Sequence, residues 1–454
     1  MSNSTTGRSA LGRVGVLVSG ALALVLIVGT TVAGAAPGTA GDGRPGSAPK
    51  RFSSMAAGPD RAICLAAFAS PCYSPQEMRH AYGVDQLQAA GGTGAGQTIV
   101  LIDSFGSPTA LADLQTFDKA YGLPDPPSFK VLAPLGTVPF DPNNSDMVGW
   151  AEETSLDIQW AHAMAPAANI VLMTSPVSET EGVQGLPEFL ALMKYAVSNH
   201  IGQVISNSWG ATEETLFDPA GRAVVGQYEQ FFEQAARQHV SILASSGDDG
   251  STDTEIDLQT LYPYPVASFP NDSPFVTSVG GTSLYTDANA NYQSETVWNN
   301  DIGAGGGGVS KLFAEPLWQR LLPFSTQQQL AGHRGAPDLS WNADPDTGAP
   351  VYLGFLPAAD NGFYIFGGTS ASSPQLAGVV ADMNQLLRRP IGLLNPYLYV
   401  LGITHHGFHD VTVGNNAFAG VPGYAATPGW DLATGWGTPD LGQFFHALAA
   451  MPAQ

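Results

Sequence analysis

Short apolar runs alternate along this chain with longer segments in which apolar residues recur at helical spacing. The runs predict β-strands at 98–102, 169–174, 204–208 and 240–244, and the longer segments predict helices at 149–163, 187–199 and 222–238. This alternation is typical of an α/β fold with a mainly parallel sheet and helices on both faces. We expect one large domain from residue 76 to about residue 450, with functional residues at the carboxyl ends of its strands.

The N-terminal segment has the pattern of an export signal. Two arginines precede an uncharged run at 14–32, and Ala33-Gly34-Ala35 follows as a small-x-small cleavage pattern. We therefore predict a signal peptide over 1–35 and a secreted protein. The run is long enough that an uncleaved membrane anchor, which would hold the protein on the outer face, is the alternative. Residues 36–75 begin rich in Ala, Gly, Pro and Ser and predict a flexible leader.

The composition is strongly acidic, with a formal net charge of −22 and only 17 Lys plus Arg. No basic patch is visible, so a nucleic-acid partner is not expected. Such a balance favours solubility, and it also favours tolerance of acid, where neutralised carboxylates no longer repel one another. In an exported chain the two cysteines, Cys64 and Cys72, would close a small structural disulfide loop. A monomer is the default expectation.

A candidate nucleophile lies in the segment GGTSASSP at 367–374. Two glycines allow a tight turn, after which Ser370 enters a helical pattern. Free N–H groups and the helix dipole favour developing negative charge at such a position. Taken alone, Ser370 could equally be a helix N-cap.

Two acidic side chains, Glu153 and Asp157, are four residues apart and share one face of a predicted helix. Like charges at this spacing repel, which raises at least one pKa and favours proton sharing. Glu152 is a rival for the same role. A third acid, Asp248, follows the strand predicted at 240–244 in the turn SSGDDG. Each feature alone is typical of a solvated helix face or a polar turn.

Together these motifs resemble the sedolisin family, the serine-carboxyl peptidases of the subtilisin-like superfamily. The segments ETSLD at 153–157, SNSWG at 206–210, SGDDG at 246–250 and GTSASSP at 368–374 occur in the family's order, and the resemblance runs from about Tyr73 to the C-terminus. It implies a subtilisin-like catalytic domain that hydrolyses peptide bonds in proteins, as an endopeptidase, at acidic pH.

The resemblance also assigns roles to residues. Ser370 is the nucleophile that forms an acyl-enzyme, Glu153 is its base, Asp157 supports Glu153, and protonated Asp248 stabilises the oxyanion. The cleft is lined by Ser208, Trp209 and Gly210. For Trp209, a place in the buried core is an equally good interpretation.

One structural Ca²⁺ ion is implied near the C-terminus. Its ligands would be the side chains of Asp410 and Asp431 and the backbone carbonyls of Val411, Thr427 and Gly429. Oxygen donors of this kind suit a hard cation. The family usually has Gly where Thr427 stands, a change that a carbonyl ligand tolerates.

Two departures from the family pattern affect the interpretation. The stretch before the first strand is too short for the long N-terminal prosegment of many members, so we expect that domain to be absent. Asp103 stands where some members carry a supporting glutamate, and it would extend the acidic network.

Two rival functions follow from the same residues. One is a subtilase that uses His162 as its base, although no histidine has an HGTH-like context. The other is a secreted or surface-anchored binding protein on a peptidase scaffold. Retention of all four acidic and serine positions argues against the second.

Overall fold

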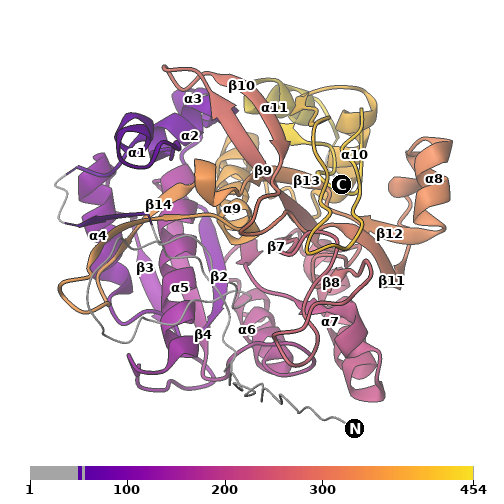
Figure 1. The fold of residues 1–454 in the computed structure, drawn as a ribbon, viewed down its shortest axis with the longest axis horizontal. Coiled ribbons are helices and arrows are strands. Elements are labelled where there is room, and N and C mark those ends of the chain that lie inside the picture. The colour runs from indigo at the N-terminus through magenta and orange to yellow at the C-terminus, as the bar shows by residue number, and fades with distance from the viewer. Residues whose placement is uncertain (1–49, 54–56, 453–454) are drawn as a thin grey trace, which may run out of the picture.

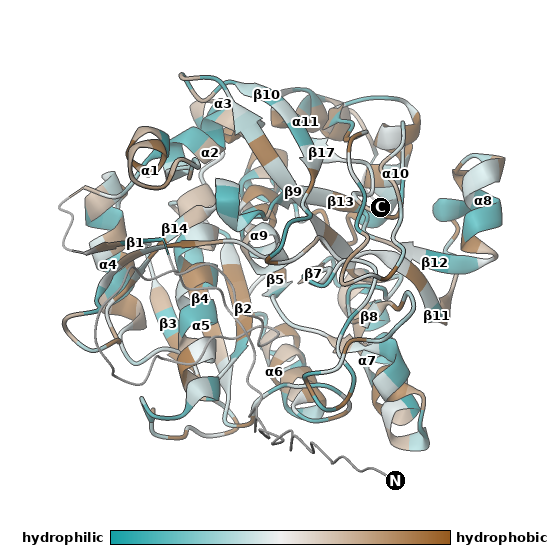
Figure 2. Cartoon of the chain, in the orientation of Figure 1, coloured by the Kyte–Doolittle hydropathy of each residue, from teal (hydrophilic) through white to brown (hydrophobic). Residues whose placement is uncertain are grey.

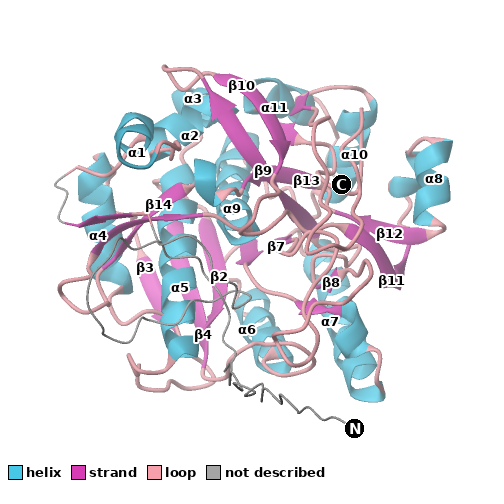
Figure 3. Cartoon of the chain, in the orientation of Figure 1, coloured by secondary structure: helices cyan, strands magenta, loops and turns pink. Residues whose placement is uncertain are grey.

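The computed structural model describes residues 50–53 and 57–452. The predicted signal peptide lies outside these residues. Figure 3 shows helices packed around a central sheet, with long loops towards the C-terminal part. The described part holds no helix long and apolar enough to cross a membrane.

The central sheet has eight strands in the described residues, in the order β10-β9-β7-β5-β2-β4-β3, with β13 paired to β9. All neighbours are parallel except β10 and β9. The strands are β2 (Thr98–Ser104), β3 (Phe129–Leu132), β4 (Asn169–Ser175), β5 (Val204–Asn207), β7 (Ser241–Ser245), β9 (Thr277–Thr286), β10 (Tyr292–Val297) and β13 (Leu339–Asn342). This confirms the predicted mainly parallel α/β sheet.

Both faces of the sheet are buried, which explains why its strands read as continuous apolar runs. Alternate side chains of β2 enter different cores: Ile99 and Leu101 pack in one cluster, and Val100 and Ile102 pack in the other. The first core is closed by α4 (Ala110–Tyr121), α5 (Ser145–Met164) and α9 (Thr369–Leu387), and the second by α6 (Leu186–Ser198) and α7 (Pro219–Arg237). Figure 2 shows the apolar strands between these helices.

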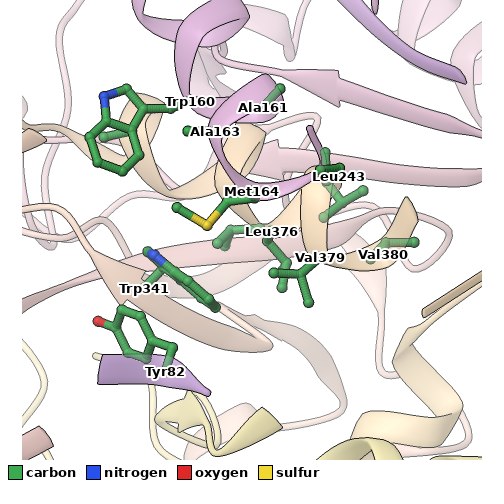
Figure 4. Packing of buried hydrophobic residues seen from close by; sticks show 14 of the residues in the cluster. Tyr82, Trp160, Ala161, Ala163, Met164, Leu243, Trp341, Leu376, Val379 and Val380 are labelled. Carbon is green, nitrogen blue, oxygen red and sulfur yellow. The ribbon is translucent and has the colours of Figure 1, made fainter. Parts of the chain in front are cut away.

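The pair α5 and α9 forms the centre of the first core. Figure 4 shows Met164 of α5 beside Leu376 and Val379 of α9. A Cβ added to Gly378 of α9 would lie 2.5 Å from the Cβ of Met164, so glycine permits the close helix contact. This packing fixes the two helices that carry the candidate catalytic residues.

Helix starts lie a few residues before the predicted ones, because polar caps precede the apolar pattern. The Asn144 side chain accepts hydrogen bonds at the start of α5, and Asp218 caps α7 with Pro219 in the first turn. Strand β5 ends at Asn207, so Ser208 lies just beyond the strand that was predicted to include it.

The predicted flexible leader is in part folded, which corrects that expectation for the described residues before 76. Strand β1 (Arg51–Ser53) pairs with β15 (Gly362–Phe366), and helix α1 (Arg61–Phe68) follows. The predicted disulfide between Cys64 and Cys72 is present, with 5.6 Å between the Cα atoms. Both cysteines are fully buried beside Ile365, so this segment is held by packing as well as by the cross-link.

The remaining elements surround this framework. They are α2 (Pro75–Tyr82), α3 (Val84–Ala89), β6 (Ala211–Thr212), η1 (Glu213–Leu216), β8 (Ser268–Phe269), β11 (Gly308–Ala314), η2 (Gln319–Leu321), α8 (Phe324–Leu330), β12 (His333–Ala336), η3 (Pro345–Thr347), β14 (Ala349–Leu353), α10 (Asn395–Ile403), β16 (Phe408–His409), β17 (Thr438–Pro439) and α11 (Leu441–Ala449). Figure 1 shows β11, β12 and α8 at one edge of the molecule.

Candidate active site

Ser370 is the second residue of α9 and is partly exposed at the N-terminus of that helix. The chain enters the helix through Gly368, whose φ of +89° is a conformation that residues with a side chain rarely adopt. The turn after β15 therefore presents the Ser370 hydroxyl at a helix end, where N–H groups lack intrahelical partners.

Glu153 of α5 lies close enough to Ser370 for the two side chains to interact. The carboxyl group is buried, and burial raises its pKa well above the usual range. The negative charge of Asp103 raises this pKa further, whereas the interaction with Ser370 opposes the shift. No histidine is among the groups that shift it.

Asp157 lies one turn further along α5 and is fully buried. It accepts a hydrogen bond of 2.8 Å from the Ser208 hydroxyl, which also lies 3.4 Å from the backbone oxygen of Ser370. Burial raises the pKa of Asp157 well above the usual range, and the charges of Asp103 and Glu153 add to the effect. Its charged form is thus opposed by both neighbouring acids.

Asp103, in β2 near its carboxyl end, is the third member of this acidic group. It is fully buried, and burial raises its pKa to about 7, opposed by the Thr154 hydroxyl. The charge of Asp103 raises the pKa of both Glu153 and Asp157. From the sequence alone we ranked Asp103 below these two residues, whereas the structure makes it a member of the same acidic group.

Asp248 lies in the turn after β7, beside the residues that precede Ser370. Its Oδ1 accepts hydrogen bonds from the backbone N–H of Thr369 at 2.7 Å and from the Thr369 hydroxyl at 2.8 Å. A Cβ on Gly368 would lie 2.6 Å from Asp248 Oδ2, so glycine leaves room for this carboxyl group. Sequence reasoning did not single out Thr369, although it stands next to the nucleophile.

The two rival bases are placed elsewhere. His162 is nine residues beyond Glu153, which is about 14 Å along a helix axis. Its Nε2 lies 2.9 Å from the carbonyl oxygen of Pro124 and 3.3 Å from Asp118 Oδ1. These polar contacts give His162 a structural role. Glu152 is fully buried and both carboxyl oxygens lack a hydrogen-bond partner within the described residues, and burial raises its pKa well above the usual range.

Comparison with known proteins agrees with this geometry. Residues 136–437 match the subtilase family. The structure superimposes on Pseudomonas sedolisin, a serine-carboxyl proteinase solved with two molecules of pseudo-iodotyrostatin, with a TM-score of 0.68 and 30% identity over 84% of this chain and 98% of the other. The chain belongs to the sedolisin family.

The curated sequences of this family include longer proteins. The chain is 36% identical to kumamolisin from Bacillus sp. (strain MN-32) over 77% of its own length, and 29% identical to sedolisin from Pseudomonas sp. (strain 101) over 78%. It spans 59% and 58% of these two proteins, respectively.

The three residues predicted to line a cleft, Ser208, Trp209 and Gly210, differ in exposure. Ser208 contacts the acidic group, as described, and Gly210 is exposed. The Trp209 ring is 5% exposed and packs in the second core, 4.7 Å from the ring of Phe189. The structure therefore favours the core interpretation of Trp209.

The segment that would bind calcium in a sedolisin brings its two carboxylates to one turn. Asp410 Oδ2 accepts a hydrogen bond from the N–H of Gly429, and Asp431 Oδ2 accepts one from the N–H of Thr427. Burial raises the pKa of Asp431 to about 6, so a nearby cation would relieve an unfavourable charge. Val411, whose carbonyl was predicted as a ligand, follows Asp410 directly in the chain. The described residues contain no group of three or more His, Cys, Asp or Glu side chains that could hold a metal ion. Two carboxylates and carbonyls fit a hard cation.

Proposed function

We propose that this protein is a secreted serine-carboxyl endopeptidase that hydrolyses peptide bonds in proteins at acidic pH. The observation that carries the proposal is the position of the buried Glu153 carboxyl group next to Ser370 at the N-terminus of α9. Ser370, Glu153 and Asp157 would act there as nucleophile, base and supporting acid, without a histidine. The likeness to a solved serine-carboxyl proteinase supports the same reaction class.

The mechanism is acyl transfer to water. Ser370 Oγ attacks the scissile carbonyl carbon while its proton passes to Glu153, which Asp157 supports as a proton-sharing partner. The peptide C–N bond then breaks, and Glu153 returns the proton to the leaving amine. Water hydrolyses the acyl-enzyme by the same steps, with Glu153 as base.

The negative charge that develops on the tetrahedral oxygen would be stabilised by two hydrogen-bond donors. The backbone N–H of Ser370 donates to it, together with the Asp248 carboxyl group in its protonated form. Asp248 is held beside Ser370 by two hydrogen bonds from Thr369. A carboxyl donor requires acid or a raised pKa, and burial among neighbouring acids raises carboxyl pKa values at this site.

Three further properties belong to the proposal. The protein would be exported, act outside the cell as a monomer, and carry one structural calcium ion at Asp410 and Asp431. The disulfide between Cys64 and Cys72 supports export, since disulfides persist in oxidising compartments. When bound, the ion would neutralise the two carboxylates and hold the turn at 427–431, away from the chemistry at Ser370.

The test is hydrolysis of a denatured protein by the wild type and by Ser370→Ala. We expect activity with an acidic optimum, and a loss of at least roughly a thousandfold in kcat in the variant. Activity confined to pH above about 8, or full activity in Ser370→Ala, would contradict the proposal. A folded wild type without activity at any pH would favour a binding scaffold.

A further inference from the structure

A projecting segment carries large apolar side chains that nothing in the described structure covers. It consists of residues 308–336, which include β11, η2, α8 and β12, and is called the arm here. Figure 1 shows its strands and α8 at the edge of the molecule. Leu317 is 74% exposed, Leu321 61% and Phe324 77%, and all three lie within eight residues. Exposed apolar groups gathered in this way mark an interaction surface.

The arm differs from the rest of this acidic chain in charge. The chain carries a net charge of −22, yet Glu315 is the acidic residue of the arm, and it is buried. Lys311 pairs with Glu214, and Arg320 is exposed beside the apolar tip. The arm itself therefore presents no exposed carboxylate next to its apolar residues.

The base of the arm is joined to the turn that holds Asp248. The N–H of Gly306 donates to the carbonyl of Gly247 at 2.7 Å, and the N–H of Ala304 donates to the carbonyl of Asp248 at 2.8 Å. The Ser246 hydroxyl donates to the carbonyl of Gly306 at 2.7 Å. The arm thus begins at the oxyanion side of the candidate active site.

A second attachment joins the arm to the chain that continues from the cleft. Glu213 lies three residues after Gly210, and its carboxylate accepts hydrogen bonds from the backbone N–H groups of Lys311 at 2.6 Å and Leu312 at 3.1 Å. The Ser310 hydroxyl also donates to Glu213. These contacts fix β11 relative to the cleft, so the apolar tip has a defined position.

We propose that the arm is an exosite that binds an apolar segment of an unfolded protein substrate while another segment of the same substrate lies at Ser370. The inference rests on the proposed peptidase function and adds a substrate class to it: extended chains with apolar segments. The seven residues of β11 span about 23 Å at roughly 3.3 Å per residue. A substrate that follows β11 along its whole length to the tip would need about seven residues for that stretch.

Attachment to the active-site turn favours this occupant over two others. At neutral pH a lipid surface with anionic headgroups is opposed by the charge of −22, with Arg320 as the cation exposed beside the apolar tip. A second copy of the chain would bring the same charge at that pH. When one segment of a substrate is bound at the cleft, a second segment of the same chain is present near the arm at high effective concentration. A small apolar contact is then enough for the second segment to bind.

The test compares the double variant Leu317→Ser/Phe324→Ser with Ile256→Ser, a control in another loop whose side chain is 66% exposed. Hydrolysis is measured on a reduced, carboxymethylated protein and on a peptide too short to leave the cleft. We expect the double variant to raise KM for the protein about tenfold, equivalent to roughly 1.4 kcal/mol of binding free energy, with kcat unchanged. The short peptide should be cleaved as by the wild type, and Ile256→Ser should match the wild type on both.

A binding measurement keeps the inference distinct from the proposed function. In the Ser370→Ala background, the same unfolded protein should bind about tenfold more weakly when the two tip residues are changed. Equal affinity of the two proteins for the substrate would overturn the exosite even if proteolysis were confirmed. If the wild type showed no proteolysis, this binding measurement would still decide whether the exosite exists. Self-association or binding to phosphatidylglycerol vesicles that disappears in the tip variant, with substrate affinity retained, would assign the surface to a second copy or a membrane instead.

Discussion

At the scale of single residues, the site depends on how burial acts on neighbouring carboxyl groups. Glu152 and Glu153 are adjacent and both are buried, yet only Glu153 faces Ser370, because consecutive helix residues point about 100° apart. The spacing to Asp157 in the sequence favoured Glu153 over Glu152, and the structure places Glu153 next to Ser370. The sequence could not rank Asp103, whose influence depends on where β2 ends relative to α5.

Asp103→Asn tests this electrostatic coupling. Ionised Asp103 raises the pKa of Glu153, so its removal should lower that pKa at the pH values where Asp103 is charged, which lie near its own pKa of about 7 and above. The limb of kcat/KM against pH that follows the ionisation of Glu153 should therefore move to lower pH. Asp113→Asn removes another buried acid, in α4, and should leave the limb in place. A limb that stays fixed or moves to higher pH in Asp103→Asn would show that Asp103 only fills space.

At the scale of elements, the sequence was sufficient to predict the framework. The strands at 98–102 and 169–174 were found because both faces are buried, and helix 149–163 was found from its apolar face. The leader at 57–75 was misjudged, since its order comes from packing of Cys64 and Cys72 against β15, a contact more than 290 residues away in sequence. The role of Thr369 likewise depends on two loops that meet only in the fold.

Gly368→Ala tests how the turn before α9 positions Asp248. An added Cβ would be strained at φ +89° and would lie 2.6 Å from Asp248 Oδ2, so the carboxyl group must move. We expect kcat to fall by about a hundredfold, in line with loss of an oxyanion donor. Gly420→Ala is the matched control, because φ is +84° there and no atom lies within 4 Å of the added Cβ. It should lose roughly 1 kcal/mol of stability and keep its activity, and equal kcat losses in both would contradict the account.

At the scale of the whole molecule, buried acids shape stability as well as catalysis. Burial raises the pKa of Asp113 to about 6, of Asp103 and Glu229 to about 7 and of Glu181 to about 8. Because these values exceed those of the unfolded chain, the folded state binds more protons between about pH 4 and 8. Stability from these groups is complete below their unfolded pKa and is lost as pH rises through the folded values.

Thermal unfolding across pH 4 to 8 measures this effect for the entire chain. We expect the unfolding temperature to fall as pH rises, and to fall further at a given pH when a calcium chelator is added. Asp431→Asn should reduce the effect of the chelator. A protein most stable near pH 8 would contradict the assignment of the buried acids, and indifference to chelation in the wild type would remove the calcium proposal.

The central claim is that a glutamate, and not a histidine, is the base for Ser370. The most direct measurement is kcat/KM against pH for the wild type, Glu153→Gln and His162→Ala on one peptide substrate. The account predicts an acidic optimum, a loss of roughly a thousandfold in Glu153→Gln, and an active His162→Ala enzyme with the same profile. An active Glu153→Gln enzyme beside an inactive, folded His162→Ala enzyme would contradict it and identify a histidine-dependent subtilase.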